Sequence, residues 1–258
     1  DYEIDRRMVF SPVFTSSNQG FHARGDVKLN VKTSGNSLLY VAVSEPMELE
    51  SGDYSADSDL FKSVIPEDFK YVGKTTDFIL QAESQNPVYF KVRAYSVSGS
   101  MKSNISEYSV IIDSYSFYCD SRGNETLADG SKDFPFTSFS QAFKSMQNLR
   151  SVKLFIAGNV KMPEGVTEIG FNFEIKGLEN ALLEFSGNSE LHIKNSSLSI
   201  DNCRIKGKTS SNMAPSLINL HNSVMSLKNC DVYFSGVRNA KFVDSNDSVF
   251  IVKDSAVT

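Results

Sequence analysis

The sequence predicts an all-β chain in which a small antiparallel β-sandwich is followed by a right-handed parallel β-helix. Up to about residue 113, short runs of alternating apolar and polar residues are separated by turn-forming residues. Within residues 114–258, a pattern that first occurs at Phe173 recurs at intervals of 25, 27 and 25 residues, which is typical of a solenoid. One helix is predicted, at about 138–149. These observations give two predicted domains, 1–113 and 114–258.

The composition is that of an ordinary globular protein. The 258 residues are 40% hydrophobic and 22% charged, with a net charge of −5 and a pI of about 5.3. Such a chain can bury a substantial core, and these values exclude disorder and collagen. No run reaches the roughly 18 apolar residues of a membrane helix, so we expect membrane contact only through an anchor outside the given chain. The absence of a basic tract argues against a nucleic-acid partner.

The first part is predicted to contain about seven short strands. Alternate apolar residues would form one face of each strand, with turn signals at residues 34–36, 50–53 and 98–100. These apolar positions are Val27, Leu29 and Val31; Leu39, Val41 and Val43; Phe78 and Leu80; and Val88, Phe90, Val92 and Ala94. About seven strands in about 110 residues indicate a small β-sandwich.

The first part also resembles a known family. Residues 37–44, 53–55, 60–61 and 88–96 are similar to the bacterial immunoglobulin-like modules of the chitobiase C-terminal type. The resemblance covers roughly residues 10–113, although Glu45-Pro46 stands where that family has an Asp-Gly turn. It implies an immunoglobulin-like sandwich that acts as a spacer or presents another domain, and does not itself catalyse a reaction.

A tripeptide in the first part invites a functional interpretation. Arg24-Gly25-Asp26 matches the integrin-binding sequence, and it immediately precedes the strand that starts at Val27. Gly and Asp are also ordinary turn residues at the start of a strand. Adhesion through this tripeptide and a plain structural turn therefore both stay open.

The entrance to the second part carries the helix signal. Apolar residues at helical spacing would share one face, with Thr137 or Ser138 as the N-cap. These residues are Phe139, Ala142, Phe143, Met146 and Leu149. A helix here would cover an otherwise exposed sheet end.

Residues 116–143 resemble the opening of pectate-lyase-like β-helix proteins, with the strand Tyr118-Cys119-Asp120, a Gly-Asp-Gly-like loop and a Pro-Phe-Thr segment before the helix. The resemblance extends over residues 116–258 and implies a β-helix with an N-terminal capping helix. It does not imply an activity, because the same opening occurs in lyases, hydrolases, adhesins and non-catalytic surface proteins.

The repeat itself predicts the coils. Segments that start at Phe173, Leu198, Met225 and Phe250 share the pattern apolar-x-apolar-x, and in the last three the next residue is Asn or Asp. The Leu-x-x-Leu-x-Leu pattern of leucine-rich repeats is absent. Two short strands around an Asn or Asp bend are expected in each coil, and the last aligned repeat stops at Thr258. We therefore expect that the natural chain continues or that a partner covers this end.

The bend residues are expected to form a ladder. Asn202, Asn229 and Asp254 would align at one bend, because Asn and Asp tolerate left-handed backbone angles. Cys203 and Cys230 would stack inward on strands about 4.8 Å apart. Side chains on parallel strands in register seldom orient well for a disulfide, so we favour free thiols, with a disulfide as the alternative. With Cys119 the count is odd and no C-x-x-C pair occurs, which argues against a zinc ribbon.

Outward positions beside this bend alternate in charge. Asp201 would lie beside Lys228, and Arg204 beside Asp231, which suits ion pairs between coils. A calcium-dependent lyase would instead need several outward carboxylates with an Arg or Lys base. The candidate binding residues from the whole sequence are Arg24, Gly25, Asp26, Asp201, Arg204, Lys228 and Asp231.

No catalytic residue, metal site or cofactor is predicted. Arg204-Ile205-Lys206 matches one tripeptide of polygalacturonase-like hydrolases, but the family's Asn-Thr-Asp, Asp-Asp and Gly-His-Gly motifs are missing. His192 and His221 miss the repeat register by two residues, which argues against a metal pair.

These observations favour a non-catalytic, exported bacterial protein of the cell surface, periplasm or extracellular space, such as an adhesin or lipoprotein, whose β-helix face binds a glycan or host matrix. The alternatives are a polysaccharide lyase or hydrolase with active coils beyond Thr258, and a scaffold subunit of an envelope assembly.

Overall fold

The computed structural model describes residues 9–49, 69–82, 84, 86–209, 216–236 and 240–258. The turn predicted at 50–53 and the segments 53–55 and 60–61 lie outside these residues. The chain is nearly all-β, with 57% strand and 4% helix. It divides into two compact units, Asp1–Ser114 and Tyr115–Thr258. Within the described residues, no helix is long and apolar enough to cross a membrane.

The described part of the first unit contains two sheets. One has the order β1 (Val13–Ser16), β3 (Val27–Lys32) and β7 (Thr75–Leu80). The other has the order β2 (His22–Ala23), β10 (Ser106–Ile112), β8 (Val88–Ser98), β4 (Leu38–Val43) and β6 (Lys70–Gly73), with β5 (Met47–Glu48) and β9 (Met101–Lys102) also paired to β8. Both sheets contribute to one buried cluster, in which Leu29 of β3 and Val92 of β8 take part. Alternation along β3 explains this, because Val27, Leu29 and Val31 all point into the cluster.

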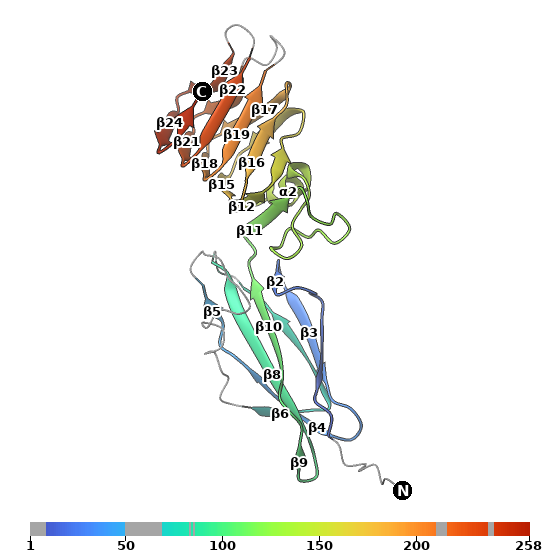
Figure 1. Ribbon diagram of the computed structural model, residues 1–258. Coiled ribbons are helices and arrows are strands. Elements are labelled where there is room, and N and C mark those ends of the chain that lie inside the picture. Colours follow the sequence, from blue (N-terminus) through green and yellow to red (C-terminus); the bar gives the residue numbers. More distant parts are fainter. Residues whose placement is uncertain (1–8, 50–68, 83, 85, 210–215, 237–239) are drawn as a thin grey trace. The chain divides into compact units, whose positions relative to one another are not determined.

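The second unit is a β-solenoid of about four turns (Figure 1). Its described strands form three parallel sheets, and the chain passes repeatedly from sheet I to sheet II to sheet III. Sheet I contains β11 (Ser116–Asp120), β12 (Ser151–Ala157), β15 (Asn172–Gly177), β18 (Ser197–Asp201), β21 (Val224–Lys228) and β24 (Val249–Lys253). Sheet II contains β13 (Asn159–Lys161), β16 (Leu182–Phe185), β19 (Arg204–Lys208), β22 (Asp231–Ser235) and β25 (Ala256–Val257). Sheet III contains β14 (Gly165–Ile169), β17 (Ser189–Lys194), β20 (Ser216–His221) and β23 (Lys241–Asn246).

The predicted repeats are the coils of this solenoid. Phe173 pairs with Leu198, Leu198 with Met225, and Met225 with Phe250, so the four aligned segments lie side by side in sheet I. Inward residues stack in the same way: Ile175, Ile200 and Leu227 are fully buried on successive strands. Burial of one such aliphatic side chain contributes about 1.5–3 kcal/mol relative to leaving it exposed. The repeat in the sequence therefore reflects a core that each coil extends.

The described helix, α2 (Phe139–Met146), is shorter than the predicted segment 138–149. Ser138 is its N-cap, and the Ser138 hydroxyl accepts a 3.3 Å hydrogen bond from the Gln141 backbone N–H. Phe139 and Met146 are fully buried and belong to the solenoid core cluster. The apolar face of α2 therefore packs against the first coils.

Candidate binding surface

A sharp corner joins sheet I to sheet II in each coil. Asn202, Asn229 and Asp254 occupy this corner with φ values of 55°, 51° and 48°. The backbone N–H of Asn202 donates to the Lys228 carbonyl at 3.0 Å, and that of Asn229 donates to the Lys253 carbonyl at 3.2 Å. Left-handed angles suit Asn and Asp. The structure therefore brings the three predicted ladder residues together as one element repeated in successive coils.

The cysteines that follow this corner lie inside the solenoid. Cys203 and Cys230 are buried and carry free thiols. Burial raises the pKa of the Cys203 thiol to about 12, with smaller contributions from the nearby Cys230 and Asp201. Cys230 Sγ donates to the Lys228 carbonyl at 3.1 Å. Because only a thiolate is a good nucleophile, these thiols are structural at neutral pH.

The predicted ion pairs between coils are wrong, although the predicted neighbours are adjacent. Asp201 pairs with Lys228, and Arg204 with Asp231, in the strand register. Among the described residues, however, neither pair is joined by a salt bridge. Asp201 Oδ1 instead accepts a 3.0 Å hydrogen bond from Asn229 Nδ2. Exposed side chains gain little from ion pairing in water, so a corner amide can replace the partner.

Arg204 and Asp231 line a hollow of about 330 Å³ beside the corner. Asn202, Asn229 and Glu179 also line it, and amide and carboxylate groups offer both donors and acceptors. Arg204 is exposed, and its Nη2 donates to the Asn180 carbonyl at 3.4 Å. Of the four charged solenoid residues predicted to bind, two therefore share one concave site. Asp201 and Lys228 do not line it.

A second hollow, of about 270 Å³, adjoins the first, because Leu178 and Glu179 line both. One of its walls is the stacked pair Tyr118 and Phe155, with ring centroids 4.8 Å apart and planes 14° apart. Tyr118 is largely buried, whereas Phe155 is half-buried. The sequence predicts the Tyr118 strand as the solenoid entrance, but it indicates no role for the outward side chains of that strand.

Asp120 and Arg122 form a preorganised pair at this second hollow. Arg122 Nε donates to Asp120 Oδ1 at 2.9 Å, and Nη2 donates to Oδ2 at 2.8 Å. These hydrogen bonds hold the pKa of the Asp120 carboxyl below its usual range. Gly158 leaves room for the pair: a Cβ there would lie 3.0 Å from Ser121 Oγ and 3.4 Å from Asp120 Oδ1.

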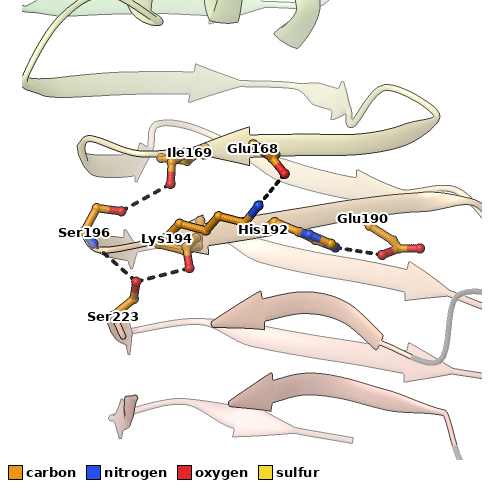
Figure 2. A network of polar contacts seen from close by, with 8 residues as sticks. Glu168, Ile169, Glu190, His192, Lys194, Ser196 and Ser223 are labelled. Atoms are coloured by element: carbon orange, nitrogen blue, oxygen red, sulfur yellow. Dashed lines mark hydrogen bonds and ion pairs between the residues drawn. The ribbon is translucent and has the colours of Figure 1, made fainter. Parts of the chain in front are cut away.

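The outer face of sheet III carries a second polar network (Figure 2). Lys194 of β17 pairs with Glu168 of β14, which lowers the pKa of that carboxyl. His192 Nε2 lies 2.8 Å from Glu190 Oε2 on the same strand. His192 pairs with Asn219 in the register, whereas His221 pairs with Lys194, so the two histidines do not align. In the part of the solenoid and first unit that the structure describes, no group of three or more His, Cys, Asp or Glu residues could hold a metal ion.

At the corner between sheets III and I, serine hydroxyls bond to the backbone of neighbouring coils, and we call this row of serines the hydroxyl spine. The Ser223 hydroxyl accepts a 3.3 Å hydrogen bond from the Ser196 backbone N–H and donates to the Ile193 carbonyl at 3.1 Å (Figure 2). Ser248 repeats the arrangement one coil further, because its hydroxyl accepts from the Ser223 N–H at 3.0 Å. These bonds satisfy buried and half-buried backbone groups at the edge of sheet III.

Arg24-Gly25-Asp26 lies in the first unit, between β2 and β3. Gly25 has a φ of 72°, which explains the need for glycine at this bend. Arg24 is half-buried, and Asp26 Oδ2 accepts a 2.7 Å hydrogen bond from Gln81 Nε2. The tripeptide therefore belongs to a structured bend whose carboxylate already has an internal partner.

No protein-family model matches the chain, and no curated protein shows a significant match to it. The site must therefore be interpreted from its own chemistry. Its two hollows offer a half-buried aromatic ring, side-chain amides, guanidinium groups and carboxylates. This arrangement can bind a hydroxylated ligand through hydrogen bonds and ring packing.

Proposed function

We propose that the chain is a non-catalytic, exported bacterial surface or periplasmic protein whose solenoid binds a glycan through its lateral surface. The observation that carries the proposal is the hollow at the corner of sheets I and II. There Arg204 and Asp231 are exposed neighbours on parallel strands and are not paired with each other. The parallel strands set the spacing between these two residues, and a rigid backbone reduces the conformational freedom that is lost when a ligand binds.

The finer fold assignments are part of the same proposal. The second unit is a right-handed, pectate-lyase-like β-helix in which α2 caps the first coils. Burial of Phe139 and Met146 in the solenoid core supports this role for the helix. The first unit is an immunoglobulin-like sandwich that presents the solenoid, and the core shared by its two sheets supports that assignment.

The direct test is binding of the labelled chain to a glycan microarray that includes neutral and acidic polysaccharides. We expect retention on a restricted set of glycans. The double variant Arg204→Ala/Asp231→Ala should weaken that binding at least about tenfold, which corresponds to about 1.4 kcal/mol. Lys253→Ala is the matched control, because Lys253 is an exposed residue of sheet I that does not line the hollow.

Two results would contradict this function. One is the absence of retention on every glycan of the array. The other is the appearance of new reducing ends or unsaturated products when the chain is incubated with the polysaccharides it retains, since either product requires catalysis. Thermal unfolding of each variant, followed by circular dichroism, separates a binding defect from loss of the fold.

A further inference from the structure

We propose that the two hollows form one groove that binds a neutral oligosaccharide of at least two sugar residues, with one ring against Phe155 and the next beside Arg204 and Asp231. The inference rests on the proposed function, and it adds the ligand class and a second subsite. The groove is defined by the residues that line the hollows of about 270 Å³ and about 330 Å³.

The size and continuity of the groove set the length of the ligand. The two hollows share Leu178 and Glu179, so a ligand can pass from one to the other without leaving the surface. Each hollow lies near the lower limit of roughly 300 Å³ for small-molecule sites. One sugar ring per hollow matches that size, and a chain of at least two rings uses both.

The first subsite has an apolar wall for the carbon–hydrogen face of a ring. Phe155 is half-buried, and its stacking on the more buried Tyr118 holds it in place. Leu178 and Pro135 also line this hollow, and the Leu178 side chain is exposed. The negative face of an aromatic ring attracts weakly positive C–H groups, which a sugar ring presents on one side.

Polar groups at the first subsite fit sugar hydroxyls. Arg122 uses two of its five side-chain N–H donors on Asp120. Among the described residues no other acceptor is hydrogen-bonded to the guanidinium, and its side chain is 65% exposed. The other three donors are therefore available to a ligand. Glu179, which is exposed between the hollows, can accept hydrogen bonds from the hydroxyls of either ring.

The charge balance of the groove favours a neutral ligand. Three carboxylates and three cations line it: Asp120, Glu179, Asp231, Arg122, Lys132 and Arg204. A polyanion such as a polyuronate would meet as many negative as positive groups, and like charges in a site oppose binding. Hydroxyl groups both donate and accept, so they can be matched by guanidinium and carboxylate groups alike.

The test is isothermal titration calorimetry of the whole chain with cellohexaose, maltohexaose, mannohexaose and chitohexaose as neutral probes, and hexagalacturonate as the acidic probe. We expect at least one neutral probe to bind and its monosaccharide to bind at least tenfold more weakly. Arg122→Ala and Phe155→Ala should each weaken binding at least tenfold, whereas Lys253→Ala should not. Because Arg122 is largely exposed, its variant should unfold at the same temperature as the original chain, even if the Phe155 variant does not.

The outcomes distinguish this inference from the function on which it rests. Binding of hexagalacturonate without any neutral probe would overturn the ligand class and leave a glycan-binding function standing. Neutral binding that depends on Arg204 and Asp231 but is unchanged in the Arg122 and Phe155 variants would overturn the subsite beside Phe155, which this inference adds. Binding of no probe, neutral or acidic, together with no retention on the microarray, would overturn both proposals.

Discussion

Gly177→Ala should destabilise the solenoid more than a Gly→Ala substitution normally does. Gly177 is buried at the end of β15, beside the corner of sheets I and II. A Cβ at this position would lie 1.9 Å from the backbone oxygen of Asn202 and 2.9 Å from the Cβ of Ala181. The Gly177 carbonyl also accepts a 2.8 Å hydrogen bond from Asn202 Nδ2. The added methyl group therefore meets backbone in the next coil.

The expected cost follows from what would have to move. Overpacking a core costs about 1–3 kcal/mol where side chains can adjust. Here the clash is with a backbone oxygen held at the corner, so the upper end of that range applies, and loss of the Asn202 hydrogen bond adds about 1 kcal/mol. A total of about 4 kcal/mol corresponds to a fall in Tm of about 8–16 °C for a domain of about 150 residues.

Two other glycines of the solenoid provide graded controls. At Gly170 an added Cβ would have no atom within 4 Å, so Gly170→Ala should leave Tm nearly unchanged. At Gly207 it would lie 1.9 Å from Cδ1 of Leu217, a side chain that can shift, so Gly207→Ala should give an intermediate loss. Thermal and urea unfolding followed by circular dichroism measure all three. Unfolding of the Gly177 variant at the same temperature and urea concentration as the Gly170 variant would refute the corner geometry.

Three further predictions concern the core, the thiols and the hydroxyl spine. Leu227→Asp should abolish cooperative thermal unfolding of the solenoid, because it buries an unpaired charge. Lys228→Asp, on the exposed face, should unfold in a cooperative transition like the original chain. Identical unfolding transitions of the two variants would show that Leu227 does not point inward. The pKa of the Cys203 thiol is raised to about 12, so this thiol should not react with Ellman's reagent at pH 8 until guanidinium unfolds the chain. Fast reaction in the native state would contradict its burial. Ser223→Ala should cost about 1–3 kcal/mol, because it removes the donor to the buried Ile193 carbonyl and the acceptor of the half-buried Ser196 N–H. Ser226→Ala should cost much less, because water can replace its half-buried hydroxyl. The free energies of unfolding of the two variants in urea decide this.

The coils could be predicted because their cause repeats in the sequence. Each coil must place apolar residues under those of the preceding coil, so Phe173 and Leu198 occupy equivalent positions in the sequence and neighbouring positions in sheet I. The corner residues repeat for the same reason, because a left-handed angle at Asn202 and Asn229 restricts the choice of residue. The repeat length in the sequence is therefore the number of residues in one coil of the solenoid.

The groove could not be predicted in the same way. Tyr118 and Asp120 lie on β11, before the aligned repeats begin, and only the pairing of β11 with β12 brings Tyr118 against Phe155. The prediction of ion pairs between coils failed for a related reason. The strand register places Arg204 beside Asp231, but it does not determine the rotamers of long exposed side chains. Solvent also screens the attraction between the two charges.

The proposed function gives the same corner a role in binding as well as in stability, largely through different side chains, although Asn202 takes part in both. Asn202 and Gly177 fix the bend through backbone geometry and one hydrogen bond. Ile205 and Val232, on strands of sheet II, are buried in the solenoid core. The outward side chains, such as Arg204, alternate with these inward ones along each strand, so an exchange of an outward residue leaves the stacked core intact. If the proposed function holds, a change in ligand preference is expected from substitutions at outward positions such as Arg204, whereas substitutions at the bend residues Asn202 and Asn229 would also change the coil itself.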